Sequence, residues 1–149
     1  MKSTNKQVIV TGACGYLGRN VVRVLISEGY RVISIDTSDD IWQSEERIVH
    51  SKVDLLKEEI PVFKDAIALI HLAGFADLEK AYDKPLKTLD LNVSLTVRMA
   101  NYCLDNNLQL LYASSMYACG VNGGFYGASK RAAETYLESF ADVLGLKST

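Results

Sequence analysis

The sequence predicts an α/β fold, a doubly wound parallel sheet of about five strands with helices on both faces. Two observations support this. Apolar runs of strand length alternate with longer segments of helical period along the 149 residues. These runs are also too apolar for strands that have one solvated face. Right-handed helical crossovers between such strands produce a doubly wound sheet. No repeat, low-complexity tract or linker divides the chain, so we expect one domain over 1–149.

The expected elements follow in order along the chain. The strands are Gln7–Thr11, Arg31–Asp36, a weaker Arg47–Val53, Ala66–Leu72 and Leu108–Ala113. The helices are Tyr16–Glu28, Pro85–Asn106 and Tyr126–Leu144. Glycines follow the first and last of these helices, and proline suits the first turn of the second. Each helix has an apolar stripe that can pack against the sheet.

Composition and charge restrict the possible partners. The formal net charge of −2 and the scattered basic residues give no reason to expect nucleic acid or an anionic membrane. No apolar run approaches the roughly 20 residues that span a bilayer, and residues 1–6 lack the apolar core of a signal peptide. Three cysteines without Cys-x-x-Cys spacing and two histidines argue against a disulfide framework or a metal site. We therefore expect a reduced cytoplasmic protein without a metal.

A glycine-rich turn joins the first strand to the first helix. Gly12, Gly15 and Gly18 have the G-x-x-G-x-x-G spacing, a variant of the dinucleotide-binding fingerprint. The glycines permit a tight turn, a close approach of backbone to a pyrophosphate, and close packing of helix on strand. The helix start at Tyr16 and Leu17 then offers free N–H groups to the anion. The alternative is a glycine-rich turn that binds nothing.

Acidic residues follow the next two strands. Asp36 ends the second strand, where a carboxylate can accept both hydroxyls of an adenosine ribose. It would repel a 2′-phosphate, and no arginine follows it in 37–39, so NAD is favoured over NADP. A solvated aspartate is the alternative. Asp54, next to Leu55, could hydrogen-bond the adenine amino group, or it could be a surface acid.

Two further features lie later in the chain. Small residues end the fourth strand, and backbone can lie against a cofactor at Leu72, Ala73 and Gly74. Tyr126 and Lys130 are four residues apart and therefore share one helix face. An ammonium near a phenol stabilises the phenolate, which a hydride-transfer enzyme can use as a base. This spacing alone is weak, because it also occurs by chance on solvated helices.

In this order the motifs resemble those of the extended short-chain dehydrogenase/reductases, the NAD-dependent epimerase/dehydratase family of nucleotide-sugar enzymes. The matching segments are Thr11–Gly18, Asp36, Asp54, His71–Gly74, Leu91–Ser94, Tyr112–Ser115 and Tyr126–Lys130. The resemblance implies a Rossmann NAD-binding domain with a catalytic set of Ser115, Tyr126 and Lys130. Ser115 rather than Ser114 aligns with the family's Ser-x-x-Val-Tyr-Gly, although Ala118-Cys119 replaces Val-Tyr.

The resemblance also implies individual roles. Lys130 would hydrogen-bond the nicotinamide ribose, and Ser115 would hold the substrate oxygen near Tyr126. Asn92 matches the family's helix asparagine, which either holds backbone or water near the lysine or makes a purely structural hydrogen bond. The family's 4,6-dehydratases carry Asp-Glu after the catalytic Ser/Thr. Here 116–117 is Met-Tyr, so a dehydratase is disfavoured.

The leading expectation is an NAD-dependent nucleotide-sugar epimerase or its cofactor-binding domain. The alternatives are a dehydrogenase/reductase of the same family and a non-catalytic NAD-binding module. Two departures bear on this choice. Only ten residues separate Ser115 from Tyr126, where extended members carry a longer substrate-facing loop. Family members are also about twice as long, so we expect the C-terminal substrate-binding part to be absent and turnover by the 149-residue chain alone to be weak or absent.

The expected partners are a nucleotide sugar and a second copy of the chain. In relatives, the helices that correspond to 85–106 and 126–144 form a four-helix bundle with a second subunit. The apolar stripes of these helices could equally pack against the chain's own sheet, so a homodimer is one of two possibilities.

Overall fold

The computed structural model describes residues 5–42, 45–120 and 122–149. It contains a five-stranded sheet of order β3-β2-β1-β4-β5, in which every neighbouring pair is parallel. The strands are β1 (Gln7–Thr11), β2 (Arg31–Asp36), β3 (Ile48–Lys52), β4 (Ala66–His71) and β5 (Gln109–Tyr112). The order reverses between β1 and β4, and such a switch point leaves a crevice at the carboxyl ends of the strands. The predicted doubly wound sheet is confirmed.

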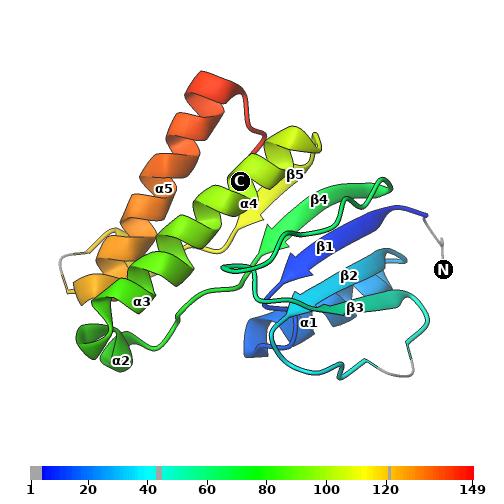
Figure 1. Ribbon diagram of the computed structural model, residues 1–149, viewed down its shortest axis with the longest axis horizontal. Helices are drawn as coiled ribbons and strands as arrows, with labels where there is room; N and C mark the ends of the chain where they lie inside the picture. Colours follow the sequence, from blue (N-terminus) through cyan, green and yellow to red (C-terminus); the bar gives the residue numbers. More distant parts are fainter. Residues whose placement is uncertain (1–4, 43–44, 121) are drawn as a thin grey trace.

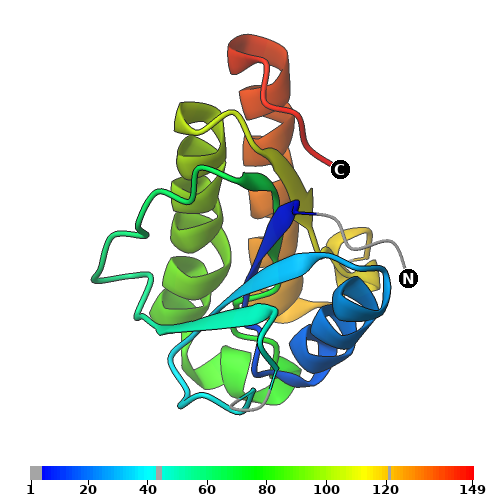
Figure 2. The same cartoon turned by 90° about the vertical axis from the view of Figure 1, so that its right-hand side faces the viewer.

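Helices cover both faces of the sheet, as predicted (Figures 1 and 2). The first, α1 (Tyr16–Ser27), packs on one face. On the other face α4 (Leu95–Asp105) lies beside α5 (Gly124–Leu144). Two short helices, α2 (Leu78–Asp83) and α3 (Pro85–Leu89), lead into α4. None of the helices in the described residues is both long and apolar enough to cross a membrane.

The apolar strands form two core layers because their alternate side chains point to opposite faces. In β1, Val8 and Val10 join the layer under α1, whereas Ile9 joins the layer under α4 and α5. All three are at most 4% exposed. Burying an aliphatic side chain of this size stabilises the fold by about 1.5–3 kcal/mol. Both layers therefore stabilise the sheet whose carboxyl edge carries the site.

The long predicted helix 85–106 is not uniform. A π-helical segment, η1 (Asp90–Ser94), separates α3 from α4, and the run ends at Asp105. Inside η1 the Asn92 side chain bonds to backbone outside the helix, and wide turns of this kind occur frequently at functional sites.

The ends of α1, β3, β4 and β5 differ from the predicted ones by one residue, and three larger features also differ from the prediction. The sequence did not predict α2, which begins where the Asp77 carboxylate accepts the N–H of Lys80 at 3.0 Å. The last helix begins at Gly124, two residues before Tyr126, and Gly124 has a φ of 51°. Beyond α5, backbone runs parallel to β5 along its outer edge, with the N–H of Tyr112 donating to the Thr149 carbonyl at 2.8 Å.

Candidate active site

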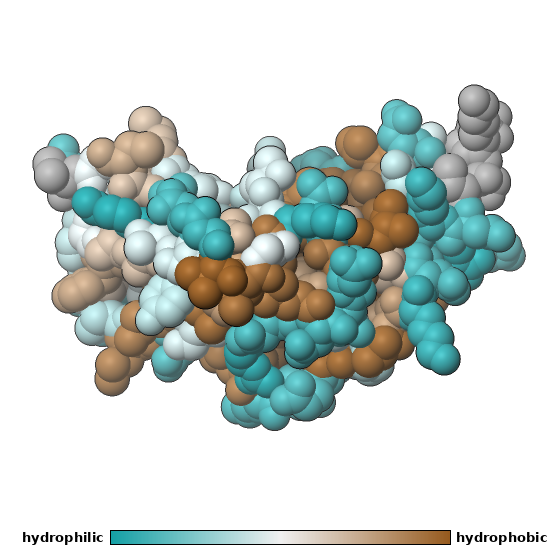
Figure 3. Space-filling view, turned by 90° about the horizontal axis from the view of Figure 1, so that it is seen from above, coloured by the Kyte–Doolittle hydropathy of each residue, from teal (hydrophilic) through white to brown (hydrophobic). Residues whose placement is uncertain are grey.

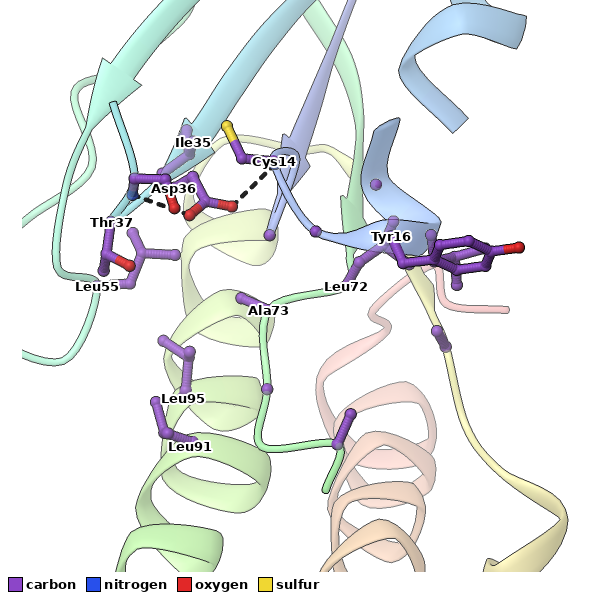
Figure 4. Close-up of a pocket in the computed structure, with 18 of the residues that line it drawn as sticks. Cys14, Tyr16, Ile35, Asp36, Thr37, Leu55, Leu72, Ala73, Leu91 and Leu95 are labelled. Carbon is purple, nitrogen blue, oxygen red and sulfur yellow. Dashed lines mark hydrogen bonds between the residues drawn. The ribbon is translucent and has the colours of Figure 1, made fainter. Parts of the chain in front are cut away.

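A cavity of about 620 Å³ lies at the switch point of the sheet, beside the carboxyl ends of β1, β2 and β4 (Figure 4). Most predicted site residues line it. They are Gly12, Gly15, Tyr16, Leu17, Gly18, Asp36, Asp54, Leu55, Leu72, Ala73, Gly74, Tyr126 and Lys130. Two predicted residues, Asn92 and Ser115, lie outside this lining. The cavity therefore joins the predicted cofactor residues to the tyrosine–lysine pair.

The glycine turn between β1 and α1 is packed so closely that side chains are excluded. A Cβ on Gly18 would lie 2.1 Å from the carbonyl oxygen of Gly12. A Cβ on Gly12, whose φ is 68°, would lie 2.7 Å from the backbone nitrogen of Ala73. The first-turn N–H groups of a helix have no acceptor within the helix, and those of α1 begin at Tyr16, which is 90% exposed. This turn can therefore present backbone donors to an anion.

Asp36 connects the glycine turn to the loop after β2. Its Oδ2 accepts the N–H of Cys14 at 2.9 Å, and its Oδ1 accepts the N–H of Ser38 at 3.0 Å. Figure 4 shows both bonds beside the labelled wall residues. A carboxylate has about four acceptor positions, so each oxygen keeps a lone pair that can accept a ligand hydroxyl.

Asp54 is a half-buried acid with partners of its own. Its carboxylate pairs with Lys57 at 2.7 Å and accepts the N–H of Leu56. The hydrogen bond from Lys57 lowers the pKa of Asp54 below its ordinary value. The neighbouring Leu55 is buried and forms part of the cavity wall.

Lys130 is a half-buried cation at the opposite end of the cavity. Its Nζ donates to the carbonyl of Ala113 at 2.8 Å and lies 4.7 Å from the centroid of the Tyr112 ring. Burial lowers the pKa of Lys130 from 10.5 to about 8, while Glu134 acts in the opposite direction. The ammonium is therefore still the main form at neutral pH. Tyr126, one helical turn earlier, meets Tyr117 edge-on.

The two serines after β5 have different surroundings. Ser114 lines the cavity. The hydroxyl of Ser115 accepts the N–H of Tyr117 at 3.3 Å and so caps a short 3-10 helix, η2 (Met116–Ala118). A hydroxyl that accepts one bond still has its own proton to donate. The proton of Ser115, which follows the cavity-lining Ser114 in the chain, is thus available for donation.

Asn92 links the segment after β4 to the helix that carries Lys130. Its Oδ1 accepts the N–H of Phe75 at 2.7 Å, and its Nδ2 donates to the Phe75 carbonyl and to Ser129 Oγ. Ser129 in turn donates to the carbonyl of Tyr126 at 2.8 Å. Asn92 thus joins backbone of the segment after β4 to the residue that precedes Lys130.

His71 is buried behind Lys130. Its Nδ1 lies 2.7 Å from the hydroxyl of Thr11, and its ring stacks against Tyr112. Burial, with a smaller effect of Lys130, lowers the pKa of His71 to about 3. The imidazole is therefore neutral at physiological pH and does not add a second positive charge next to Lys130.

A model of the NAD dependent epimerase/dehydratase family matches residues 8–149, nearly the whole chain. The chain belongs to the NAD-dependent epimerase/dehydratase family. Similar curated proteins include "Bifunctional protein GAL10" of Candida maltosa, which is 33% identical over 121 residues. "UDP-glucose 4-epimerase" of Lactobacillus helveticus is 27% identical over 121 residues. These matches cover 72% and 75% of this chain, and 79% and 36% of the relatives.

Solved structures of the epimerase/dehydratase family have the same fold. UDP-N-acetylglucosamine 4-epimerase from Methanobrevibacter ruminantium, in complex with UDP-N-acetylmuramic acid, has a TM-score of 0.81 at 27% identity. UDP-glucose 4-epimerase from Brucella ovis, in complex with NAD, has a TM-score of 0.82 at 23% identity. The matches cover 99% and 96% of this chain, which spans 54% and 50% of those structures.

NAD is the cofactor of this family, and the residues of the cavity fit it. The glycine turn leaves no room for side chains where backbone donors meet an anion. Asp36 has spare acceptor positions beside this turn, and the side chains of Val53 and Leu55 add an apolar wall. A dinucleotide needs these three features of a parallel sheet: an anion site, a hydroxyl acceptor and an apolar surface.

Several wall residues were not predicted from the sequence. They are Cys14, Ile35, Thr37, Ser38, Val53, Leu56, Ala76, Leu91, Leu95, Ala113 and Ser114. Thr37 and Ser38 follow Asp36 directly, so their place after a strand was a usable signal. Leu91 and Leu95 come from the helical run over the other face, and periodicity alone cannot tell a cavity wall from a core.

Proposed function

We propose that this chain is the NAD-binding and catalytic part of a nucleotide-sugar epimerase that acts on a UDP-sugar. One observation carries the proposal: Tyr126 and Lys130 open onto the same cavity as the glycine turn and Asp36. Similar proteins that are UDP-glucose 4-epimerases or a UDP-N-acetylglucosamine 4-epimerase support a UDP-sugar as the substrate class. Residues 1–149 would then act as one NAD-binding domain.

In this function the glycine turn holds the pyrophosphate of NAD, and Asp36 accepts the hydroxyls of its adenosine ribose. Asp54 and Leu55 border the adenine, while Leu72, Ala73 and Gly74 let backbone lie along the cofactor. Lys130 hydrogen-bonds the nicotinamide ribose. Bound NAD supplies a nicotinamide that accepts a hydride and returns it.

The chain's own residues move the proton. Tyr126 removes the proton of a sugar hydroxyl, and the Lys130 ammonium favours the phenolate that does this. The Ser115 hydroxyl donates to the substrate oxygen with the proton that its bond to Tyr117 leaves free. Tyr126 would also return the proton to the sugar oxygen, so that the hydroxyl is restored at the end of an epimerisation.

The test measures binding and turnover separately. Tyr126→Phe should retain NAD affinity, while conversion of UDP-glucose to UDP-galactose should fall by roughly 10²–10⁴-fold, the usual contribution of a general base. Asp36→Ala should weaken NAD binding first. An epimerase recycles NAD, so release of stoichiometric NADH with product would instead identify a dehydrogenase/reductase. Unchanged turnover in Tyr126→Phe would contradict the assignment.

A non-catalytic NAD-binding module is the second candidate. The ten-residue connection between Ser115 and Tyr126 favours it, because little chain is available there to face a substrate. A module of this kind would bind NAD with wild-type affinity and show no turnover with any UDP-sugar, including in the wild-type chain. Met116 and Tyr117 cannot serve as an acid/base pair, so we do not propose a dehydratase.

We also propose that the chain forms a homodimer through α3, α4 and α5. Hydrophobic side chains reach the surface among hydrophilic ones (Figure 3). On α3 and α5 the exposed ones include Leu86 at 75%, Leu89, Tyr136 and Val143 at 77%. Leu86→Glu and Val143→Glu together should shift sedimentation from dimer to monomer, whereas Val24→Glu on α1 should not. A wild-type monomer at working concentration would contradict the dimer.

For its compartment we propose the reducing cytoplasm. Cys14, Cys103 and Cys119 are all free thiols, and burial raises the pKa of the Cys103 thiol to about 12. The formal net charge of −2 supports the prediction that neither nucleic acid nor membrane is a partner.

A further inference from the structure

A buried hydroxyl lies in the middle of β2, on the α1 side of the sheet. Ser34 is fully buried, and the side chains beside it on this face include Val8, Val10 and Val32. Taking a hydroxyl out of water is unfavourable unless it is hydrogen-bonded. The partners of Ser34 therefore indicate why a polar residue occupies this position.

Ser34 belongs to a chain of hydrogen bonds that has one direction. The Trp42 indole Nε1 donates to Ser34 Oγ at 3.1 Å, and Ser34 Oγ lies 3.0 Å from His50 Nδ1. His50 Nε2 lies 3.1 Å from the carbonyl of Ser38. An indole only donates and a carbonyl only accepts. The Nε2 of His50 therefore carries a proton that it donates to Ser38, and in the neutral imidazole Nδ1 accepts the proton of the Ser34 hydroxyl.

This chain ends at the ribose side of the cofactor cavity. Ser38 is held at both backbone groups, because its carbonyl accepts from His50 and its N–H donates to Asp36. The second oxygen of Asp36 holds the glycine turn through Cys14. The loop and the turn that flank the ribose-binding carboxylate are thus fixed relative to β2 and β3.

The connection between β2 and β3 depends on this network for its shape. Over 37–42 and 45–47, the residues described in this connection, no helix covers the sheet. The Trp42 side chain packs against the apolar layer under α1 instead. A loop without secondary structure of its own depends on side-chain contacts to keep one shape. Here His50 holds the Ser38 carbonyl, and Ser34 holds the Trp42 indole.

We propose that Ser34, His50 and Trp42 are positioning residues that hold loop 37–42 in the shape that receives the adenosine ribose of NAD at Asp36. The proposal rests on the NAD site described above and goes beyond it, because none of the three residues needs to touch the cofactor. A loop released from the network must be ordered when NAD binds, at about 1–2 kcal/mol per residue. Ordering even one residue predicts roughly tenfold weaker binding.

The test measures binding of NAD, ADP-ribose and nicotinamide mononucleotide by calorimetry. Ser34→Ala cuts the chain of bonds at its buried centre, and His50→Phe cuts it at a half-buried position that is less critical for folding. Ser34→Thr keeps a hydroxyl at this position and should therefore bind NAD about as tightly as the wild-type chain does. Val49→Ala, on the same strand as His50 but 52% exposed, is the matched control. Trp42 is the only tryptophan, so its single indole N–H resonance reports the network without any ligand.

The expected result is roughly tenfold weaker binding of NAD and ADP-ribose in Ser34→Ala and His50→Phe, with the affinity for nicotinamide mononucleotide unchanged and the indole resonance shifted. Affinities within twofold of wild type would overturn the proposal while leaving the NAD site in place. Equal weakening of all three ligands would also overturn it, because the effect would then be global. A wild-type chain that binds none of them would refute the NAD site itself, and the proposal with it.

Discussion

The two ends of the cavity are built in different ways. The end proposed to bind adenosine, called the adenosine end below, is built from backbone of β1, α1 and β2: glycines without room for a Cβ, N–H groups of a helix start, and one carboxylate bonded to two loops. The end proposed to be catalytic, called the catalytic end, uses a charge from α5, because Lys130 is held in partly dry surroundings by the Ala113 carbonyl and the aromatic face of Tyr112. The first end is fixed by steric constraints and the second by electrostatics.

The steric end should respond most strongly to the smallest change. In Gly18→Ala the new Cβ would lie 2.1 Å from the Gly12 carbonyl and 2.7 Å from Ala13 Cα. Both neighbours are backbone and cannot easily move aside, so we expect the free energy of unfolding to fall by about 3 kcal/mol, the upper end of the usual cost of overpacking. NAD binding should disappear as well.

Urea unfolding and calorimetry check this prediction. Gly120→Ala is the control, because a Cβ there meets nothing closer than 4.0 Å. If Gly18→Ala were as stable as Gly120→Ala, the account of a backbone-limited adenosine end would be wrong.

The electrostatic end should show its cost as a pH dependence. Lys130 titrates near pH 8 in the folded chain, compared with 10.5 ordinarily. The unfolded chain therefore binds the Lys130 proton more tightly than the folded chain. Burial of the ammonium lowers the free energy of unfolding by its full amount below pH 8. The free energy of unfolding contributed by Lys130 should rise by about 3 kcal/mol as the pH rises from about 8 to about 10.5. Lys130→Met should lack this rise. Near pH 7 it should be more stable than the wild-type chain, by an amount reduced by the lost hydrogen bond to the Ala113 carbonyl.

Denaturant unfolding of both proteins from pH 6 to 10 provides the measurement, and the difference between wild type and Lys130→Met cancels the other titrating groups. If the difference in the free energy of unfolding did not change with pH, the Lys130 ammonium would not be desolvated. The electrostatic account of the catalytic end would then be wrong.

The carboxylate at the adenosine end should affect affinity more than stability. Asp36→Ala removes the acceptor proposed for the ribose hydroxyls and frees the N–H groups of Cys14 and Ser38. Hydrogen bonds to a charged group contribute about 1.5–3 kcal/mol, so NAD affinity should fall by roughly 10–100-fold. The preference for NAD over NADP should also shrink, because the repulsion of a 2′-phosphate is lost. Calorimetry with both cofactors tests this, and an unchanged preference would contradict the role of Asp36.

Loss of the Tyr126 hydroxyl should have the smallest effect on stability and on NAD affinity. Tyr126→Phe removes only a hydroxyl at the cavity, so unfolding and NAD affinity should each change by less than about 0.5 kcal/mol. Thermal unfolding and a NAD titration suffice to check it. A tenfold loss of NAD affinity would show that the catalytic end also carries cofactor binding, and the division between the two ends would fail.

The sequence was informative where local rules decide the structure. The five strands, the glycine turn and the position of Asp36 follow from apolar runs, glycine spacing and strand ends, which involve near neighbours in the chain. The π-helical segment at Asn92 depends on bonds to Phe75 and Ser129, which are far from it in sequence. The network of Ser34, Trp42 and His50 likewise exists only once β2 and β3 have paired, so no spacing rule could have found it.

Calorimetric titration of the purified 149-residue chain with NAD tests the central claim most directly. We expect one binding site per chain, weakened roughly 10–100-fold in Asp36→Ala and unchanged in Tyr126→Phe. Absence of binding at millimolar NAD, or equal loss of affinity in the two variants, would contradict the claim that the adenosine end of this chain is a preformed NAD site.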